Sequence, residues 1–574
     1  MMRDRVWRLA EPLADGIAPD LAGWPQPLRQ LLFNRGLRTR DAVEAFLYPE
    51  TAGLYDPGLL LGMEVAVDRI YRALRNEELI AIYGDFDVDG LTAVALLSEV
   101  LESPSLEGRV VGHLPHRARD GYGLHFDSIQ ALAEQGARLL ITVDCGIGAD
   151  EQVRYANSLG MDVIVTDHHL ISGGVPPALA VLNAHQDGCS YPFKELSGVA
   201  MAYKLAEALL AKLWGLDAAR ERLRPQLDLV ALGLVADVAP LVGENRLLVK
   251  LGLEQIARGT RPGLQALVRS AGLRDRALDA ELISYTLTPR LNAAGRMGDA
   301  RLSLDLLRAE SDREAERMAL ELEETNRWRQ SATAVALNGV REELSQLAEL
   351  PPAIVLAGDY PTGIVGLVAG RIAEEFNRPS FIIELGETES RGSGRGVPGF
   401  DVVRALSGAS DLLIRFGGHA QAGGFALRTS SLTPLRDRLI ASALEQLGTT
   451  VARQELLLEA ELALSSVGPV LYEYLSVLEP YGAGNSRPIF CSRKLQVREA
   501  RIVGNSHLKL RLSDQTAVCS AIGFGMGGGD YDFARPGAVV DCAYSISRND
   551  RGGTASYEMI LKDLRSWSAA PYVL

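Results

Sequence analysis

The sequence predicts a multidomain α/β protein with a parallel-sheet domain, a long connecting helix, a smaller α/β domain and a C-terminal β-barrel. Three observations predict this fold class. Short apolar runs alternate with amphipathic segments in the first half of the chain, a charged stretch without proline follows, and short strands occupy the C-terminal part. Buried strands alternating with helices are typical of parallel α/β sheets, and closely spaced strands are typical of small barrels.

Length and composition exclude several classes of protein. The chain has 574 residues, which at roughly 100–200 residues per domain predicts about three or four domains. Hydrophobic residues make up 47% and charged residues 23% of the sequence, so neither intrinsic disorder nor a collagen-like repeat is expected. No apolar run is long enough to span a bilayer, and the N-terminus lacks the hydrophobic centre of a signal peptide, which predicts a cytoplasmic protein without a membrane partner. The 5 cysteines show no CxxC spacing, so neither a disulfide framework nor a cysteine zinc site is expected.

The first two predicted parts cover residues 1–48 and 49–305. Residues 1–48 contain one short helical pattern, at residues 40–47, and are expected to form a small N-terminal helical segment. The next part has apolar runs separated by amphipathic segments such as 91–101 and 150–159, which predicts a parallel sheet with helices on both faces. The predicted strands are residues 79–83, 110–114, 139–143 and 162–166.

The remaining parts follow from a change of pattern near residue 301. The stretch up to residue 350 has no proline and no strand signal, so it predicts one long helix or a helix pair, with residues 306–350 as the connection between two domains. Residues 351–460 are expected to form the smaller α/β domain, with strands at 353–357 and 380–384 around a helix at 364–376. Residues 465–574 are expected to form the barrel, with strands at 489–492, 495–502, 508–512, 518–524, 539–547 and 556–564.

Three aspartates lie between the first predicted strand and the helix that follows it. Asp85, Asp87 and Asp89 alternate along this loop, and their carboxylates repel one another unless cations neutralise them. A calcium-binding EF-hand is the alternative for the DxDxDG pattern. That loop needs a helix before it and a glutamate at its twelfth position, where this chain has Leu96. The strand before the loop and the missing glutamate favour another kind of metal site.

Two further predicted strands end in acidic or imidazole side chains. One is followed by Asp144 and the next by Asp167-His168-His169. Because ligands bind outside the carboxyl ends of parallel strands, we expect these residues to converge with the acidic loop. Asp237 is a fourth candidate, since it follows another apolar run. Taken singly, Asp237 could be a helix cap and the histidine pair could be structural, but together with the loop they indicate a metal centre.

The ligand types indicate which metal and which chemistry to expect. Carboxylates with a minority of imidazoles and no thiolate suit Mn²⁺ or Mg²⁺ better than structural zinc. Five or more carboxylates are too many for one ion, so the sequence predicts two divalent ions bridged by one aspartate. Such a pair activates water and clamps the oxygens of a phosphoryl centre, which predicts phosphoester hydrolysis.

These residues resemble the DHH phosphoesterase superfamily, which takes its name from the Asp167-His168-His169 triplet. From about residue 25 onward the chain is similar to the members that are bacterial single-strand-specific 5′ exonucleases. The resemblance includes Ser197-Gly198-Val199 with Lys204, and the motifs that contain Arg117, Tyr122, Arg290, Asn292 and Arg296, which we expect to bind substrate.

The resemblance also implies roles for the metal-site residues. The implied metal ligands are Asp87, Asp89, Asp144, His168 and Asp237. Within this set Asp144 is the expected bridge, and His169 is expected to contact the scissile phosphate or the attacking water. Smaller members of the superfamily carry histidine where this chain has Tyr83, so Asp85 is expected to supply the missing ligand.

The second α/β domain resembles the DHHA1 domain that accompanies DHH domains. Its glycine-rich stretches let backbone amides approach a phosphate, while arginine and histidine neutralise it. Structural turns are the alternative explanation for the glycines. The residues expected to act on the end of the strand are Arg391, Arg395 and His419, with Ser393, Gly417 and Gly418 contributing to binding.

The barrel resembles an OB-fold, a fold that binds single strands through a basic groove and stacking aromatic rings. The available aromatic residues are Phe490, Phe524 and Tyr544, and the alternative is that they fill the barrel core. Basic residues on or beside the predicted strands are the better indication, and we expect them to contact DNA. They are Arg493, Lys494, Arg498, Arg501, Lys509 and Arg511.

Taken together, the resemblance implies an exonuclease that hydrolyses single-stranded DNA in the 5′→3′ direction and releases 5′-mononucleotides in DNA repair and recombination. It implies a helicase and a single-strand-binding protein as partners, and we expect a monomer. One alternative is a phosphodiesterase for short oligonucleotides or cyclic dinucleotides, which would not need an extended basic barrel. The other is a metal-free replication scaffold, which would have lost its carboxylates.

The net charge at first argues against a nucleic-acid partner. The chain carries 59 Lys and Arg against 73 Asp and Glu, a formal net charge of −14. Most of the acidic excess, however, lies within residues 81–240, the stretch that holds every predicted metal ligand. We therefore expect DNA to bind to local basic tracks, in a manner that depends on metal and weakens with salt.

Overall fold

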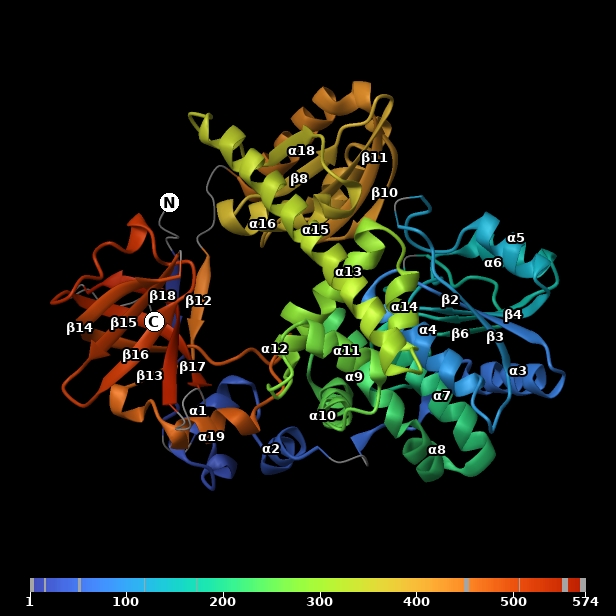
Figure 1. The fold of residues 1–574 in the computed structure, drawn as a ribbon, viewed down its shortest axis with the longest axis horizontal. Helices are drawn as coiled ribbons and strands as arrows, with labels where there is room; N and C mark the ends of the chain where they lie inside the picture. The colour runs from blue at the N-terminus through green and yellow to red at the C-terminus, as the bar shows by residue number, and fades with distance from the viewer. Residues whose placement is uncertain are drawn as a thin grey trace. The chain divides into compact units, whose positions relative to one another are not determined.

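The computed structural model (Figure 1) describes residues 5–14, 17–49, 53–117, 119–171, 173–448, 454–504, 506–549 and 556–567. The chain forms two compact units. The first combines Met1–Gly53, Leu241–Gly243 and Ala452–Leu574, and the second combines Leu54–Pro240 and Glu244–Val451. The predicted end segments extend to residues 1 and 574, and within them residues 1–4 and 568–574 lie outside the described residues.

The first sheet of the larger unit is entirely parallel, as predicted. Its strand order is β3-β2-β4-β5-β6. The strands are β2 (Leu79–Gly84), β3 (Arg109–His113), β4 (Ala137–Val143), β5 (Asp162–Thr166) and β6 (Ala180–Leu182). The last of these was not predicted, because three residues are too few to give a periodic signal.

Helices cover both faces of this sheet, which confirms the prediction. Figure 1 shows α5 and α6 on one side of the strands and α3, α4 and α7 on the other. These helices are α3 (Met63–Arg75), α4 (Val88–Leu101), α5 (Phe126–Glu134), α6 (Asp150–Ser158) and α7 (Gly198–Trp214). Tyr83, Leu140 and Val163 pack with Ile129 and Val153 in the core under α5 and α6.

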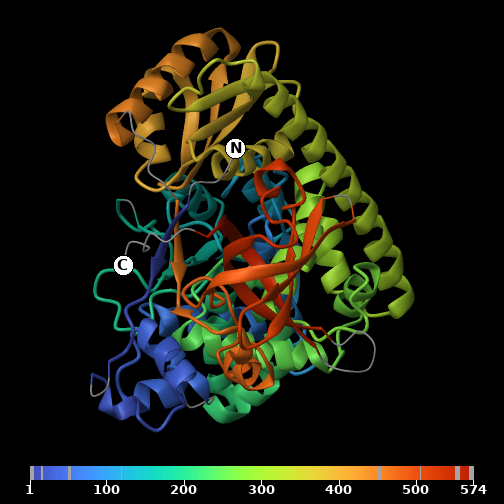
Figure 2. The same ribbon diagram turned by 90° about the vertical axis from the view of Figure 1, so that its left-hand side faces the viewer.

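Further helices form the part of the chain that lies in sequence between the two sheets of this unit. They are α8 (Leu216–Leu223), α9 (Leu227–Ala236), α10 (Gly243–Ala257), α11 (Pro262–Ser270), α12 (Ala280–Leu282), α13 (Thr288–Met297) and α14 (Arg301–Leu307). The long connection is α15 (Asp312–Ser345), a 34-residue helix that begins where the Ser311 side chain accepts a hydrogen bond from the Glu314 amide. Figures 1 and 2 show α15 running from the helices of the first domain to the second domain.

The second sheet is mixed and has the order β10-β11-β9-β8-β7, in which only β7 and β8 are parallel. Helices α15 and α16 cover one of its faces, and α17 and α18 cover the other. The elements are β7 (Ile354–Gly358), α16 (Val365–Phe376), β8 (Ser380–Glu384), β9 (Glu389–Arg395), α17 (Val402–Ser407), β10 (Leu413–His419), β11 (Ala422–Arg428) and α18 (Leu432–Leu447).

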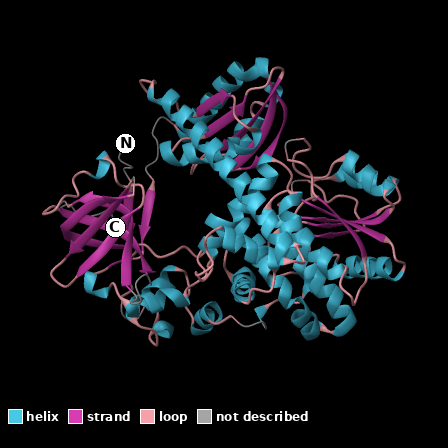
Figure 3. Cartoon of the chain, viewed as in Figure 1, coloured by secondary structure: helices cyan, strands magenta, loops and turns pink. Residues whose placement is uncertain are grey.

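The smaller unit contains a closed barrel of five strands, β14-β15-β16-β18-β17, in which β17 pairs back with β14. Figure 3 shows the strands of this unit in magenta. These are β14 (Phe490–Val503), β15 (His507–Ser513), β16 (Val518–Gly523), β17 (Val539–Asn549) and β18 (Ser556–Ser566). The two strands predicted at 489–492 and 495–502 are wrong in one respect, since they form the single strand β14. Register shifts interrupt its pairing with β17 and β15, which explains the break in the sequence pattern.

The N-terminal segment packs into the barrel unit. It consists of β1 (Val6–Leu9), α1 (Gln26–Asn34) and α2 (Arg40–Leu47), and β1 pairs in parallel with β12 (Glu455–Leu458). Leu31 and Val43 share one apolar core with barrel residues and with α19 (Pro469–Val477), while β13 (Ala460–Glu461) pairs with β14. None of the described helices has the length and apolar character needed to cross a membrane.

Candidate metal centre

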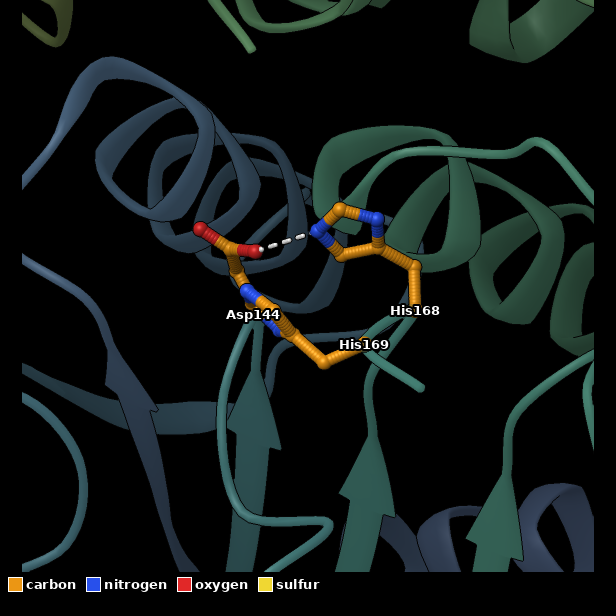
Figure 4. Close-up of side chains that lie close together, drawn as sticks. All are labelled: Asp144, His168 and His169. Carbon is orange, nitrogen blue, oxygen red and sulfur yellow. Dashed lines mark hydrogen bonds and ion pairs between the residues drawn. The ribbon is translucent and has the colours of Figure 1, made fainter. Parts of the chain in front are cut away.

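The predicted metal ligands gather where the order of the first sheet reverses. β3 lies on one side of β2 and β4 lies on the other, so the carboxyl ends of β2 and β4 flank the switch point at which sheets of this kind bind ligands. Asp85 follows β2, Asp144 follows β4, and the His168-His169 pair follows β5. Figure 4 shows Asp144 and the two histidines beyond the ends of neighbouring strands.

The loop after β2 holds three carboxylates in different surroundings. Asp85 is 4% exposed, and its Oδ1 atom is a buried oxygen without a hydrogen-bond partner in the described part of the chain. Burial and the charge of Asp87 raise the pKa of Asp85 well above its usual range. Asp87 caps α4 by accepting hydrogen bonds from the amides of Asp89 and Gly90 at 3.0 and 3.2 Å. Asp89 lies in the first turn of α4, where burial and Asp87 raise its pKa to about 7.

Asp144 lies in a backbone conformation that few side chains adopt. Its φ of 59° is in the left-handed region, which is uncommon for residues other than glycine and which recurs at functional sites. The Oδ1 atom is 3.0 Å from Nε2 of His168 (Figure 4). Burial, Asp89 and Asp87 raise the pKa of Asp144 well above its usual range. The chain is therefore bent to bring this carboxylate among other acids.

Asp237 joins the same group from a helix rather than from a strand. The apolar run before it is the end of α9, and Asp237 is the C-cap residue of that helix. Its Oδ2 atom lies 4.0 Å from Nδ1 of His168, while Nε2 of the same ring lies 4.0 Å from Oδ2 of Asp89. Burial and Asp89 raise the pKa of Asp237 to about 8, whereas burial and His169 lower the pKa of His168 to about 4. The imidazole is consequently neutral and able to bind a cation.

Ligand atoms fall into three overlapping groups, each with its atoms within 4.8 Å of one another. The groups are Asp144, His168 and His169; Asp89, His168 and Asp237; and Asp85, Asp87 and Asp144. An unpartnered buried oxygen and carboxylates with raised pKa values describe a site with excess negative charge. Oxygen and imidazole ligands without thiolate fit divalent cations such as Mn²⁺ and Mg²⁺.

His169 points to a different set of partners. Its Nδ1 atom is 2.7 Å from Oδ1 of Asp167, which also accepts the amide of His168, while the other Asp167 oxygen accepts the amide of Ile147. Burial acts to lower the pKa of His169, but the hydrogen bond to Asp167 prevails and raises it to about 9. Tyr122 lies 3.3 Å from Nδ1 of His169 through its hydroxyl. The histidine is therefore held as a cation beside the metal ligands.

The domain built on the second sheet (β7–β11) also contributes side chains next to the metal ligands. The ring of His419, at the end of β10, lies parallel to that of His169 with centroids 5.8 Å apart. Arg395 donates to Ser393 Oγ at 2.6 Å, and Arg296 donates to the carbonyl oxygen of Gly363 at 3.2 Å. Arg117 lies over the ring of Phe86, 4.3 Å from its centroid.

These three arginines form a concentrated positive charge next to the acidic loop. Burial and the charges of Arg117, Arg329 and Arg395 lower the pKa of Arg296 well below its usual range. Burial and Arg117 likewise lower the pKa of Arg395, and burial lowers that of Arg117 against the attraction of Asp85 and Asp87. Half-buried cations that repel one another beside a metal centre are suited to bind the oxygens of a phosphate.

The other predicted substrate residues of this unit lie outside the groups of metal-ligand atoms. Arg391 forms an ion pair with Glu389 at 3.5 Å, and Arg290 bonds Glu323 at 2.7 Å. Asn292 is half-buried on α13, while Gly417 and Gly418 lie on the exposed strand β10. None of the groups of ligand atoms found among the described residues includes them.

The basic residues of the barrel are partly neutralised. Lys509 pairs with Glu558, Arg511 pairs with Glu499 at 3.2 Å, and Arg498 bonds Ser513 at 2.8 Å. Lys494 lies over the ring of Trp567, Arg501 is exposed, and Arg493 is half-buried.

The aromatic residues of the barrel divide between its core and its surface. Phe490 and Tyr544 are buried in the core, as the alternative explanation had it. Phe524 is 59% exposed, so it is the aromatic side chain that remains available to a base.

Three residues beside the centre were given no role from the sequence. Phe86 lies under Arg117, Asp167 holds His169, and Ser197 bonds Asp89. Asp167 and Ser197 belong to motifs that the sequence does display, but a motif does not say which neighbour its side chain contacts. Phe86 gave no signal beyond its place between two aspartates.

A parallel sheet whose reversal point gathers carboxylates and imidazoles for divalent cations is the arrangement of a DHH-type metal-dependent phosphoesterase. A family model described as "DHH family, N-terminal domain" matches residues 79–234, and one described as "RecJ OB domain" matches residues 458–563. The chain is 33% identical over 570 residues to the single-stranded-DNA-specific exonuclease RecJ of Bacillus subtilis, a match that covers 98% of this chain and 69% of that protein. The chain belongs to the RecJ family.

Solved structures agree with this assignment. A crystal structure of RecJ from Thermus thermophilus in complex with Mn²⁺ matches with a TM-score of 0.84 at 31% identity, over 99% of this chain and 81% of that one. A second structure of the Thermus protein, in complex with Mg²⁺, matches with a TM-score of 0.78 at 30% identity, over 99% of this chain and 80% of that one. Both ions are those that the ligand types of this site favour.

Proposed function

We propose that this protein uses two divalent ions to hydrolyse single-stranded DNA from its 5′ end and to release 5′-mononucleotides. We propose that it does so in DNA repair and recombination. One observation carries the proposal. The three overlapping groups of ligand atoms lie at the switch point of the sheet, directly beside the charge of Arg117 and Arg296. An acidic site for cations next to half-buried arginines is complementary to a phosphodiester with its metal ions.

The ligand groups support a pair of ions rather than one. Asp85, Asp87 and Asp144 would hold one ion, and Asp89, His168 and Asp237 would hold the other. Asp144 also belongs to a group with His168, which supports its assignment as the bridge between the two positions. When bound, two such ions supply a water of lowered pKa and neutralise charge on the phosphate oxygens.

The side chains around the metal position the phosphate and stabilise its charge. Arg117, Arg296 and Arg395 would bind the oxygens of the phosphate groups at the 5′ end. Because Asp167 accepts a hydrogen bond from Nδ1–H of His169, the Nε2–H of that imidazolium would donate to the scissile phosphate. His419, which belongs to the second domain, would hold the 5′ end of the DNA strand. We assign Arg391 to the same DNA strand.

The other parts of the chain would bind the DNA strand beyond the metal centre. We propose that residues 49–305 catalyse, that residues 351–460 hold the strand's end, and that the barrel of residues 465–574 binds the strand farther along through Arg501 and Phe524. The remaining predicted contacts, such as Tyr122 and Asn292, would lie along the same path. We also propose that the protein acts as a monomer in the cytoplasm, with a helicase and a single-strand-binding protein as partners.

The Asp144→Ala variant tests the metal site. We expect the loss of Mn²⁺ binding, measured by calorimetric titration, and a decrease of nuclease activity by more than about 100-fold, because the loss of a ligand exceeds the effect of losing a residue that supports one. Asp150→Ala is the matched control, since Asp150 is an exposed acid that pairs only with Arg154 among the described residues. Activity that survives in the Asp144 variant would remove the metal site from the mechanism.

Strand polarity and substrate length are tested with labelled DNA. A 5′-labelled single strand of several tens of nucleotides should release labelled mononucleotide at once, whereas a 3′-labelled strand should shorten without early release of its label. Cleavage that is efficient only on strands of a few nucleotides would favour the phosphodiesterase for short oligonucleotides. Mn²⁺ binding without cleavage of any substrate would favour the scaffold.

A further inference from the structure

The Ser197-Gly198-Val199 motif forms the start of α7 and lies against the carboxylate of Asp89. Ser197 Oγ donates to Oδ1 of Asp89 at 3.0 Å, and the Val199 amide donates to the same oxygen at 3.0 Å. The Gly198 amide donates to Oδ2 at 2.6 Å. Both oxygens of one carboxylate are therefore held by a single helix terminus. Ser197 itself is fully buried, so it can act only through Asp89.

The backbone of α7 and α9 packs so closely around Asp89 that it restricts the position of the carboxylate. A side-chain carbon added at Gly198 would lie 2.8 Å from Oδ1 of Asp144, and one added at Gly233 would lie 2.7 Å from Oδ1 of Asp89. Neither position has room for a larger residue. Helices α7 and α9 thus approach the carboxylates with bare backbone, and a small rotation of α7 would displace the donors from Asp89.

Buried ion pairs hold α7 in this position. Lys204, about two turns along the helix from Ser197, contacts Glu207 at 3.1 Å and Glu244 at 2.9 Å, with all three side chains inaccessible to solvent. Glu207 also pairs with Arg220 at 2.6 Å. These contacts tie α7 to α8 and α10, so the orientation of its first turn is set from behind the metal site.

Hydrogen bonds of this kind leave a carboxylate available to a cation. Oδ1 of Asp89 accepts two hydrogen bonds and Oδ2 accepts one, so Oδ2 keeps a lone pair for a cation. The partial positive charge of a helix N-terminus favours the ionised form. Asp89 shares its ligand group with His168 and Asp237 and is absent from the group of Asp85, Asp87 and Asp144. Support for Asp89 therefore acts on one of the two ion positions.

We propose that Ser197 is a positioning residue which orients Asp89 and thereby sets the affinity of the ion position shared by Asp89, His168 and Asp237, without affecting the other position. The inference rests on the proposed function, in which Asp89 is a metal ligand. Residues that orient metal ligands through hydrogen bonds contribute about 10–100-fold to metal affinity.

Mn²⁺ titration of the full-length protein, by calorimetry and by electron paramagnetic resonance of the free ion, tests the proposal. In Ser197→Ala we expect one of two binding steps to weaken by about 10-fold while the other is unchanged. Ser197→Thr, which keeps the hydroxyl, should restore the wild-type isotherm. In nuclease assays, Ser197→Ala should need more Mn²⁺ for half-maximal activity and reach a near wild-type kcat at saturating metal.

Two further variants make the outcome decisive. Ser380→Ala is the matched control, because Ser380 is a fully buried serine of β8 that bonds a backbone carbonyl at 3.0 Å away from the centre. A Ser197→Ala isotherm equal to that of the control, or an equal weakening of both steps with a lowered Tm, would overturn the inference. Asp89→Asn distinguishes a failure of the inference about Ser197 from a failure of the proposed function. Wild-type Mn²⁺ binding in that variant would show that Asp89 is not a metal ligand and would contradict the proposed function itself.

Discussion

In the proposed mechanism, Arg117 is the side chain that links the acidic loop to a phosphate of the substrate. Its guanidinium lies over the ring of Phe86 and is attracted by Asp85 and Asp87, although burial lowers its pKa. A planar cation can stack on a ring and present two donors to one phosphate, whereas an ammonium group cannot. Its role therefore depends on shape as well as on charge.

Arg117→Lys should lower kcat/KM on single-stranded DNA by about 100-fold, a magnitude typical of losing one donor to a developing charge. The control is Arg119→Lys in the same loop, where the arginine is 77% exposed and pairs with Asp120. Steady-state kinetics at saturating Mn²⁺ measures both. Equal activities of the two variants would contradict the assignment of Arg117 to the phosphate.

At the scale of elements, α7 carries two lysines in opposite surroundings. Lys204 is fully buried between Glu207 and Glu244, whereas Lys212 is 42% exposed and pairs with Asp68 at 2.6 Å. Removing one partner of a buried pair leaves uncompensated charges in the interior, but exposed pairs contribute little.

Lys204→Met should lower the free energy of unfolding of its unit by about 3–5 kcal/mol, because it removes the ammonium group between two buried glutamates and leaves Glu207 only its pair with Arg220. Lys212→Met should change it by less than about 1 kcal/mol. Urea titration without metal measures both values. Similar stabilities for the two variants would show that water or rearrangement compensates for the buried acids.

Helix α9 ends on an unfavourable residue next to Asp237. Val238 has a φ of 60°, its amide bonds Val235 O at 3.3 Å, and the Ala239 amide bonds Leu234 O at 3.1 Å. This is a helix ending in which glycine usually takes the left-handed position. A β-branched side chain there is strained.

Val238→Gly should therefore raise the stability of the metal-free protein by about 1 kcal/mol. Asn377→Gly is the matched control, because Asn377 holds the same conformation after α16 and asparagine tolerates it, so a smaller gain is expected. Thermal unfolding without metal compares the two. A less stable Val238 variant would mean that the contacts of the valine outweigh its backbone strain.

At the scale of the whole molecule, the two units have separate cores. Leu31 of the N-terminal segment is buried in the core that includes the barrel, while all the proposed metal ligands belong to the other unit. Thermal unfolding should therefore show two transitions, one for each unit. A core substitution in one unit, or a metal bound to the other, should shift only the transition of that unit.

Leu31→Ala should destabilise only the barrel unit, by about 2–5 kcal/mol, since it leaves a cavity in that core. Mn²⁺ at 100 times its Kd should stabilise only the other unit, by about 2.7 kcal/mol. Differential scanning calorimetry follows both transitions, and Leu457→Ala, which truncates a 65% exposed side chain of the barrel unit, is the control. A single transition that both changes shift would contradict the independence of the units.

The sequence alone predicted much of the fold and the composition of the candidate site. Alternation of apolar runs with amphipathic segments is a local property, so it predicted four strands of the first sheet at nearly their observed positions. The absence of proline and of a strand signal, also a local property, predicted the long helix. The acidic loop and the histidine triplet indicated divalent metal because like charges so close together need cations. The short strand β6, the continuity of β14 and the helical setting of Asp237 were missed, since each depends on pairing or packing with distant residues.

By itself, the sequence determined which chemical groups this protein brings to a metal centre and which strands precede the acidic loop, Asp144 and the histidine pair. Only the tertiary structure decided that the N-terminal segment packs with the barrel, that His419 faces His169, and that the start of α7 holds Asp89. The physical reason is that side-chain type and periodicity are written along the chain, whereas hydrogen bonds and close packing between distant segments exist only after the helices and sheets have come together.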